Sequence, residues 1–267
     1  MESELWSNIN YLANISYINN AFIYELDISK ANINVLKSKG ILDDNTYNFL
    51  YKLEHDMRYR YIGKMIQKNP SIQKILTDGI IEAKQWLFSS NNIQDREVLS
   101  IKNDAVFIIG REPKYKEFNN LVRFITKGVF TGFYRVGKLL EFYYFYNKSN
   151  KQEQITIKGI DDNKWLSSHN DYMINLFKDI FYTLQCNSIE EAINKLKIFY
   201  FNYINLELPI GFYREFDSNS NFKFKDFPYV INNITDEYKP YLDITCNINL
   251  IIELQKILFN IYFNKHK

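Results

Sequence analysis

The stretches YELDISKANINVL (Tyr24–Leu36) and VLSIKNDAVFII (Val98–Ile109) decide how this sequence folds. In each, an apolar, strand-like run carries one aspartate, Asp27 or Asp104, to the end or edge of a strand. After Asp27 the apolar residues take up a helical spacing, which indicates that a helix follows the strand at once. Asp104 follows Asn103 between two short apolar runs, a pattern typical of a hairpin turn. The two stretches therefore predict a strand–helix junction and a hairpin, each presenting a carboxylate.

The rest of the chain alternates between helical and strand-like periodicity. We expect helices over about residues 30–39, 44–53, 55–68, 71–89, 168–186, 189–206 and 244–264. Ser29, and Asp43 or Asp44, are the expected caps of the first two helices, and Gly40 is expected to end the first of them. We expect strands over residues 21–26, 97–102, 105–109, 121–126, 129–136, 139–146 and 154–158.

This order of elements predicts an α+β fold. The expected architecture is an antiparallel sheet with a helical insertion between its first and second strands and a helical C-terminal lobe. We expect residues 1–160 to form one domain, which includes the insertion over about residues 43–89. Residues 161–267 are expected to form a second, mainly helical lobe.

Composition sets broad limits on the function. The chain has 267 residues, of which 46% are hydrophobic and 24% charged, so it can bury a core and global disorder is not expected. The net charge of +2 is lower than is usual for proteins that coat nucleic acids, but an enzyme with a local basic groove and an acidic metal site can also balance near zero, so the charge discriminates little. Heavy use of Asn, Ile, Lys, Tyr and Phe indicates an AT-rich genome, such as that of a low-GC bacterium or its phage.

The two cysteines and the N-terminus indicate the compartment. Cys186 and Cys246 fit no metal or redox spacing, so we expect two buried, reduced thiols. The first residues are acidic and lack the pattern of a signal peptide, and no apolar run reaches the ~18 residues of a membrane span. We expect a soluble cytoplasmic protein, in the host cytoplasm if it is phage-encoded, with no membrane partner.

The segment around Asp27 resembles the first palm motif of the family B DNA polymerases, in which an aspartate ends a strand and a short helical turn follows. Glu25 and Asp27 point to the same side of the strand, so that side should be solvated, paired or metal-bound. The resemblance implies that backbone amides of the turn accept a triphosphate. Asn32 stands where that family has an aromatic residue that excludes the ribose 2′-hydroxyl, which leaves the sugar preference open. The alternative is a strand–helix junction capped by Asp27 and Ser29.

The segment Asp104–Phe107 resembles the tail of the last palm motif, in which a hairpin-turn aspartate precedes a small residue, Val or Ile, and Phe. The family B motif has a second acidic residue where this chain has Lys102. The family A motif has one where this chain has Asn103. Asp104 is therefore the single carboxylate of the motif. The alternative is a plain Asn-Asp hairpin turn.

Together the two motifs imply a palm-like nucleotidyltransferase that carries out two-metal phosphoryl transfer on a nucleic-acid primer. Asp27 and Asp104 would be the catalytic metal ligands, with Glu25 as a third, and the cofactor would be Mg²⁺ or Mn²⁺. Two such cations stabilise the attacking and the leaving oxygen. The helices of residues 43–89 and of residues 161–267 stand where fingers and a thumb lie in that resemblance.

Cationic side chains supply candidate contacts to phosphates. Arg60, Lys64 and Lys68 recur every four residues and form a basic stripe along one helix face. Arg60 and Lys64 also resemble the start of the family A nucleotide-binding helix. We expect these three residues and Asn32 to contact a nucleotide. We expect the nucleic-acid backbone to be contacted by Lys102, Lys127 and Arg135. The alternative for the stripe is a solvated helix face.

Two other functions remain open from the sequence. One is a catalytically degenerate palm that acts as a replication or transcription accessory, or as an inhibitor, by binding nucleic acid or a protein partner. Such a partner could also supply missing polymerase parts. The other is an unrelated α+β binding protein in which Asp27 and Asp104 are only capping and turn residues. Carboxylates more than ~10 Å apart could not share a two-metal site, so their separation distinguishes this last case.

Overall fold

The structure, a computed structural model, describes residues 15–136, 140–147, 152–158, 170–186 and 188–205, with isolated positions beyond. The chain divides into two compact units. Among the described residues, unit 1 holds residue 15 and residues 21–130, and unit 2 holds residues 16–20 and those from 131 onward. Two strands, β1 and β4, contribute residues to both units. Each unit is described by itself below.

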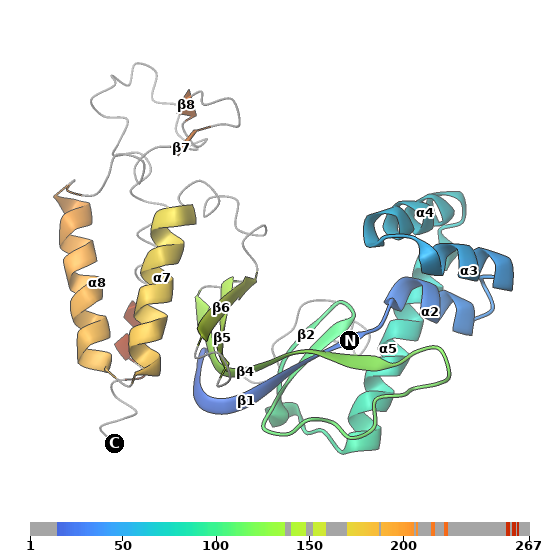
Figure 1. Ribbon diagram of the computed structural model, residues 1–267, viewed down its shortest axis with the longest axis horizontal. Coiled ribbons are helices and arrows are strands. Elements are labelled where there is room, and N and C mark those ends of the chain that lie inside the picture. Colours follow the sequence, from blue (N-terminus) through green and yellow to red (C-terminus); the bar gives the residue numbers. More distant parts are fainter. Residues whose placement is uncertain are drawn as a thin grey trace. The chain divides into compact units, whose positions relative to one another are not determined.

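The described elements confirm the α+β fold class. Six strands form an antiparallel sheet in the order β2-β3-β1-β4-β5-β6, and a two-stranded sheet pairs β7 with β8. The strands are β1 (Tyr17–Ile28), β2 (Val98–Lys102), β3 (Ala105–Ile109), β4 (Phe124–Val136), β5 (Leu140–Asn147), β6 (Gln152–Lys158), β7 (Glu215–Phe216) and β8 (Phe222–Lys223). The helices are α2 (Ala31–Ser38), α3 (Asp44–Lys52), α4 (His55–Lys68), α5 (Ser71–Asn91), η1 (Asp95–Glu97), α7 (Asn170–Gln185) and α8 (Ile189–Ile204). The insertion between β1 and β2 is therefore helical, as predicted (Figure 1).

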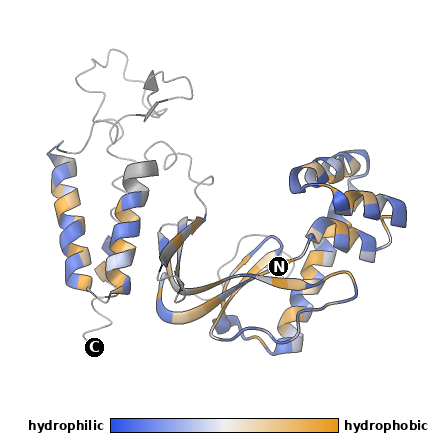
Figure 2. Ribbon diagram, viewed as in Figure 1, coloured by the Kyte–Doolittle hydropathy of each residue, from blue (hydrophilic) through white to orange (hydrophobic). Residues whose placement is uncertain are grey.

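In unit 1 the insertion packs onto the sheet through its first and last helices. The apolar faces of α2 and α5 meet β1, β2 and β3 in one core, and each fully buried aliphatic side chain contributes about 1.5–3 kcal/mol. Gly79 of α5 allows α2 to approach closely, because a Cβ atom there would lie 2.5 Å from Cγ1 of Val35. The core includes Leu26, Ile33, Leu36, Leu76, Leu87, Ile101, Val106 and Ile108. By contrast, α3 and α4 are mostly hydrophilic (Figure 2).

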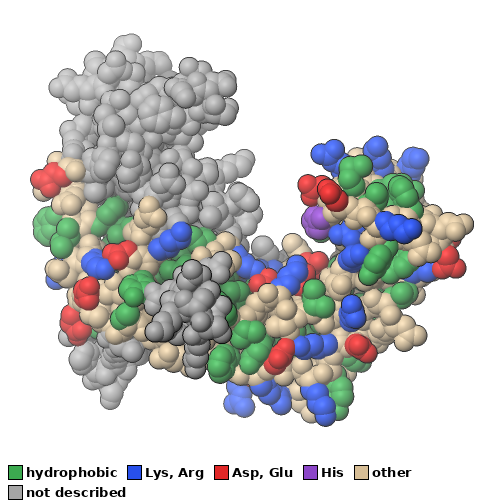
Figure 3. All heavy atoms as spheres, in the orientation of Figure 1, with side chains coloured by type: hydrophobic (Ala, Val, Ile, Leu, Met, Phe, Trp, Pro, Cys, Tyr) green, Lys and Arg blue, Asp and Glu red, His purple; other side chains and the backbone are tan. Residues whose placement is uncertain are grey.

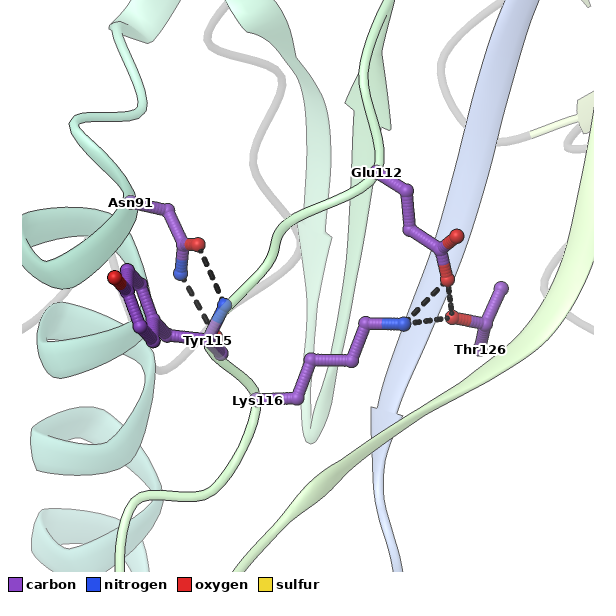
Figure 4. Close-up of polar contacts among 5 residues, drawn as sticks. All are labelled: Asn91, Glu112, Tyr115, Lys116 and Thr126. Carbon is purple, nitrogen blue, oxygen red and sulfur yellow. Dashed lines mark hydrogen bonds and ion pairs between the residues drawn. The ribbon is translucent and has the colours of Figure 1, made fainter.

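A clasp of polar contacts holds the loop between β3 and β4 against the end of α5 (Figure 4). Asn91 donates to the Tyr115 carbonyl oxygen at 2.8 Å and accepts from the Tyr115 amide at 2.9 Å. Lys116 donates to Thr126 at 2.8 Å, and Thr126 donates to Glu112 at 2.6 Å. Side chains alternate along a strand, so the residue after Thr126 lies on the opposite side of β4.

Unit 2 packs α7 and α8 against aromatic residues of β4 and β5. The rings of Tyr134 and Phe181 are stacked, with centroids 5.4 Å apart. Tyr17, at the start of β1, donates its hydroxyl to the Leu184 carbonyl oxygen at 3.1 Å, which ties the beginning of the unit to α7. Strands β5 and β6 therefore belong with the helices of this unit rather than with the sheet core of unit 1.

Several local predictions hold. Asp43 caps α3 by accepting from the Thr46 amide at 2.8 Å. Gly40 follows α2 with a φ of 72°, a left-handed conformation that suits glycine. The β2–β3 hairpin turns at Asn103, whose φ is 45°, with Lys102 opposite Ala105.

Other local predictions are wrong. Ser29 does not cap α2: Lys30 occupies that position, and no side chain caps the helix. The two strands predicted over residues 121–136 form one strand, β4, which begins at Phe124 because residues before it belong to the clasped loop. Cys186 is an exposed thiol rather than a buried one. Cys246 and most of the helix predicted over residues 244–264 lie outside the described residues.

Within the part of the chain that the structure describes, no helix is both long enough and apolar enough to cross a membrane.

Candidate functional site

Two aspartates meet at one end of the unit 1 strands. Asp27 lies opposite Ala105 in the register of β1 and β3, so the turn residue Asp104 is its immediate neighbour. The backbone joins them as well, since the Ile28 amide donates to the Asp104 carbonyl oxygen at 3.2 Å. Burial raises the pKa of Asp27, and the charge of Asp104 raises that pKa further. The strand–helix junction and the hairpin therefore bring their carboxylates to one place.

A lysine from the neighbouring strand reaches the first aspartate. Lys127 of β4 forms an ion pair with Oδ2 of Asp27; the lysine side chain is 52% exposed, whereas that of Asp27 is 7% exposed. Burial acts to lower the pKa of Lys127, but the hydrogen bond to Asp27 and the charges of Asp27, Asp104 and Glu25 outweigh it and raise that pKa. The lysine therefore remains charged at neutral pH beside a group of carboxylates.

A pocket of about 250 Å³ opens on these groups. It is lined by Asp27, Asp104, Lys127, Ile125, residues 28–33 at the start of α2, and His55, Arg58 and Tyr59 of α4. The start of α2 has no side-chain cap and no acidic residue in its first turn. The first amides of a helix and its dipole attract anions, so this end of the pocket favours a negatively charged group.

A second pocket, of about 360 Å³, shares Asn32, Tyr59 and Asp104 with the first. It extends between α4 and α5, where aliphatic side chains such as Ile62, Ile66 and Ile80 form most of its wall. Gln73, Thr77 and Asn103 supply uncharged hydrogen-bonding groups. The first pocket is therefore charged and the second mainly apolar, and Asp104 touches both.

Tyr59 and Asn32 form the wall between the two pockets. Burial and the charge of Asp104 raise the pKa of Tyr59, against a hydrogen bond with Asn32 that lowers it. The ring of His55 lies 4.5 Å from that of Tyr59, centroid to centroid. The wall is therefore made by α2 and α4 together, and it reaches close enough to Asp104 for their charges to interact.

A buried lysine lies behind the second aspartate. Lys84 of α5 is 0% exposed, and its Nζ atom donates to the carbonyl oxygen of Asn103, the residue before Asp104. Burial lowers the pKa of Lys84 to about 8, although the charge of Asp104 acts in the opposite direction. Sequence reasoning missed Lys84. Its burial could have been predicted from its position in the sequence, four residues after Ile80 on the apolar stripe of the helix.

The structure brings only some of the predicted nucleotide-binding residues to the pockets. Asn32 and Lys127 line the first pocket, but Arg60, Lys64 and Lys68 are exposed and line neither. The pocket face of α4 holds His55, Arg58, Tyr59, Ile62, Gly63 and Ile66, a different stripe of the helix. Arg58, which sequence reasoning also missed, is the α4 cation that faces the site. Lys and Arg side chains cluster over the α4 part of the surface in Figure 3.

The remaining predicted residues lie around or away from the pocket. Glu25 lies on β1 and is close enough to act electrostatically on Asp27. Lys102 ends β2 with its Nζ atom 5.2 Å from the centroid of the Phe107 ring, and it lines neither pocket. Arg135 belongs to unit 2, where it lies opposite Glu141 on β5.

The site offers Mg²⁺ two carboxylates rather than a preformed cluster. Mg²⁺ is commonly held by one or two carboxylates together with water and substrate phosphates. Asp27 and Asp104 meet that requirement, whereas no group of three His, Cys, Asp or Glu side chains suited to a metal occurs among the described residues. The residues present therefore fit a cation that arrives with a phosphate-bearing ligand.

Comparison with known proteins identifies a phage family. A family model described as the bacteriophage PBS1 gene 130 protein matches residues 1–260, which is nearly the whole chain. No curated protein matches the chain.

Proposed function

The chain belongs to the bacteriophage PBS1 gene 130 protein family, and we propose that this phage protein is a palm-like nucleotidyltransferase. The observation that carries the proposal is the meeting of Asp27 and Asp104, from β1 and from the β2–β3 turn, at one pocket. The strand order β2-β3-β1-β4 supports it, because the strand with the first aspartate lies directly beside the hairpin with the second. This is the arrangement that the palm resemblance implies.

The proposed substrate is a nucleoside triphosphate bound as its Mg²⁺ or Mn²⁺ complex. Asp27 and Asp104 would hold the cations, which stabilise the charge on the attacking and leaving oxygens when bound. The uncapped start of α2 and the guanidinium of Arg58 lie where the phosphates would bind. Lys127 can exchange its contact with Asp27 for one with a phosphate, because its side chain is half exposed.

The test is primer extension by the full-length protein with Mg²⁺ or Mn²⁺. Asp27→Asn and Asp104→Asn each remove a metal-binding charge while keeping the shape of the side chain. We expect each variant to lose about 1,000-fold or more in rate, since metal stabilisation of the transition state is worth several kcal/mol. Asp78→Asn is the matched control, because Asp78 is an exposed residue of α5 that lines neither pocket. Incorporation that survives both active-site changes contradicts the mechanism.

A second function is a degenerate palm that acts as an accessory or inhibitor in replication or transcription. Two observations favour it: Asn103 stands where a second acid could stand, and Lys127 already pairs with Asp27. Calorimetry with Mn²⁺ and a nucleoside triphosphate separates the two proposals. Nucleotide binding that requires the metal supports the enzyme, and its absence supports the accessory protein.

A further inference from the structure

We infer that Lys84 is the positioning residue for Asp104: its buried ammonium group holds the carbonyl oxygen of Asn103 and thereby fixes the turn that presents the carboxylate. This inference rests on the proposed function, because it concerns the same site. It adds to the candidate site a residue of α5, Lys84, whose side chain lines neither pocket.

The first argument is that Lys84 is buried in the core of unit 1. Lys84 lies within α5, where its neighbours on the same face, Ile80, Ala83 and Leu87, belong to or pack against the core of unit 1. A lysine is almost never fully buried unless its charge is matched, because removing an ammonium group from water is costly. An aliphatic residue would fill the same space without that cost, so the ammonium group itself has a role.

The second argument is the group that the ammonium contacts. Asn103 has a φ of 45°, which is a left-handed conformation that only a few per cent of residues other than glycine adopt. Its carbonyl oxygen accepts from Lys84 on the side of the core. On the other side of the turn, the Asp104 carbonyl oxygen accepts from the Ile28 amide of β1. The turn is thus held at two consecutive carbonyls, by α5 and by β1.

The third argument is that holding the turn also holds the carboxylate of Asp104 in position. Asp104 lines both pockets, and its carboxylate would have to stay close to that of Asp27 to share a ligand. A two-residue hairpin loop has few contacts of its own, so an unanchored turn would let Asp104 move away from Asp27. The contact from Lys84 therefore restricts the position of Asp104 without touching any ligand.

The first test needs no metal and reads the turn directly. Lys84→Met keeps most of the unbranched stem and removes the ammonium group. We expect amide hydrogen exchange at Ile28, whose acceptor is the Asp104 carbonyl, to become about tenfold faster. Exchange at Leu26, inside β1, should stay the same and serves as the internal control. Unchanged exchange at Ile28 in a folded variant overturns the inference.

The second test asks whether Lys84 acts through Asp104. The affinity for Mn²⁺ with a nucleoside triphosphate is measured for Lys84→Met, Asp104→Asn and the double variant. We expect Lys84→Met to weaken binding about tenfold in the wild-type background and to have no further effect when Asp104 is already Asn. A purely structural role predicts the same loss in both backgrounds, and that result overturns the inference.

The two tests separate the failure of the inference from that of the proposed function. If wild-type protein binds no metal–nucleotide complex, the proposed function fails, while faster exchange at Ile28 still supports the role of Lys84 in the turn. If binding is present and Asp104-dependent but insensitive to Lys84→Met, the proposed function stands and the inference fails. If Lys84→Met does not fold, Lys84→Leu repeats both measurements with a side chain common in helical cores.

Discussion

The two aspartates of the site are each associated with a lysine, but the two lysines differ in their exposure and in the group they contact. Lys127 is half exposed, comes from the neighbouring strand and pairs with the carboxylate of Asp27 itself. Lys84 is fully buried, comes from a helix and donates to the backbone carbonyl oxygen of Asn103, the residue before Asp104. Under the proposed function, the first lysine can leave when a ligand arrives, whereas the second holds the turn in place. Similar residues therefore have different roles because of what surrounds them.

Of the changes that test this comparison, a change in pH is expected to have the largest effect, and it acts on the free energy of unfolding. The pKa of Lys84 is about 8 in the folded protein and ~10.4 in the unfolded chain, so the unfolded state binds more protons between these values. Stability therefore rises with pH in that window, and the penalty of the buried charge is fully present below pH 8. From pH 7.5 to 10, wild type should gain about 2 kcal/mol in free energy of unfolding relative to Lys84→Met. Urea unfolding of both proteins at the two pH values measures this difference, and parallel pH profiles would contradict the burial of a charged lysine.

Arg58 is a third cation that can sharpen the comparison, because it lines the pocket and forms no ion pair with an aspartate among the described residues. Arg58 lines the first pocket, whereas Arg60, two residues on, is exposed and does not. We expect Arg58→Ala to weaken nucleoside triphosphate binding about tenfold, the usual cost of a charge-assisted hydrogen bond to phosphate. Arg60→Ala is the matched control and should change the affinity little. Equal losses from both variants would show that general charge rather than position matters. Calorimetry with full-length protein gives both affinities.

The smallest effect is expected at Lys127. Lys127→Met removes the ammonium group that competes with a cation for Asp27, so the affinity for Mn²⁺ alone at pH 7.5 should rise a few-fold. The gain is small because the lysine side chain is half exposed and solvent screens the pair. Lys114→Met is the control, since Lys114 is exposed and lies on the loop before β4. Weaker Mn²⁺ binding by Lys127→Met would instead assign the lysine a supporting role in the metal site.

The fold could be predicted from the sequence largely because its signals are local. The Asn-Asp turn, the cap at Asp43 and the helical spacing of α5 each depend on a few neighbouring residues, and the structure agrees with them. The wrong cap at Ser29 shows the limit. Its backbone amide donates to the carbonyl oxygen of Arg123, a contact that no local pattern reveals.

The candidate site could be predicted only in part, because it depends on which faces pack together. The strand patterns in the sequence identified the two aspartates, but they did not show which face of α4 lies toward the pocket. A basic stripe at Arg60, Lys64 and Lys68 has a regular spacing, yet the helix turns Arg58 and Tyr59 toward the pocket instead. Lys84 was hidden for the opposite reason, since a single charge on an apolar stripe does not disturb the pattern.

The hydrogen bond from Tyr17 to Leu184 has a consequence for the order in which the chain folds. It joins residues separated by 167 positions, and residues 21–130 of unit 1 lie between them. Contacts at such separations close slowly, while a contiguous segment can fold as soon as it leaves the ribosome. The segment that carries both aspartates is therefore expected to be folded while unit 2 still lacks α7. A stalled or truncated translation product of this phage protein would then already contain the candidate site.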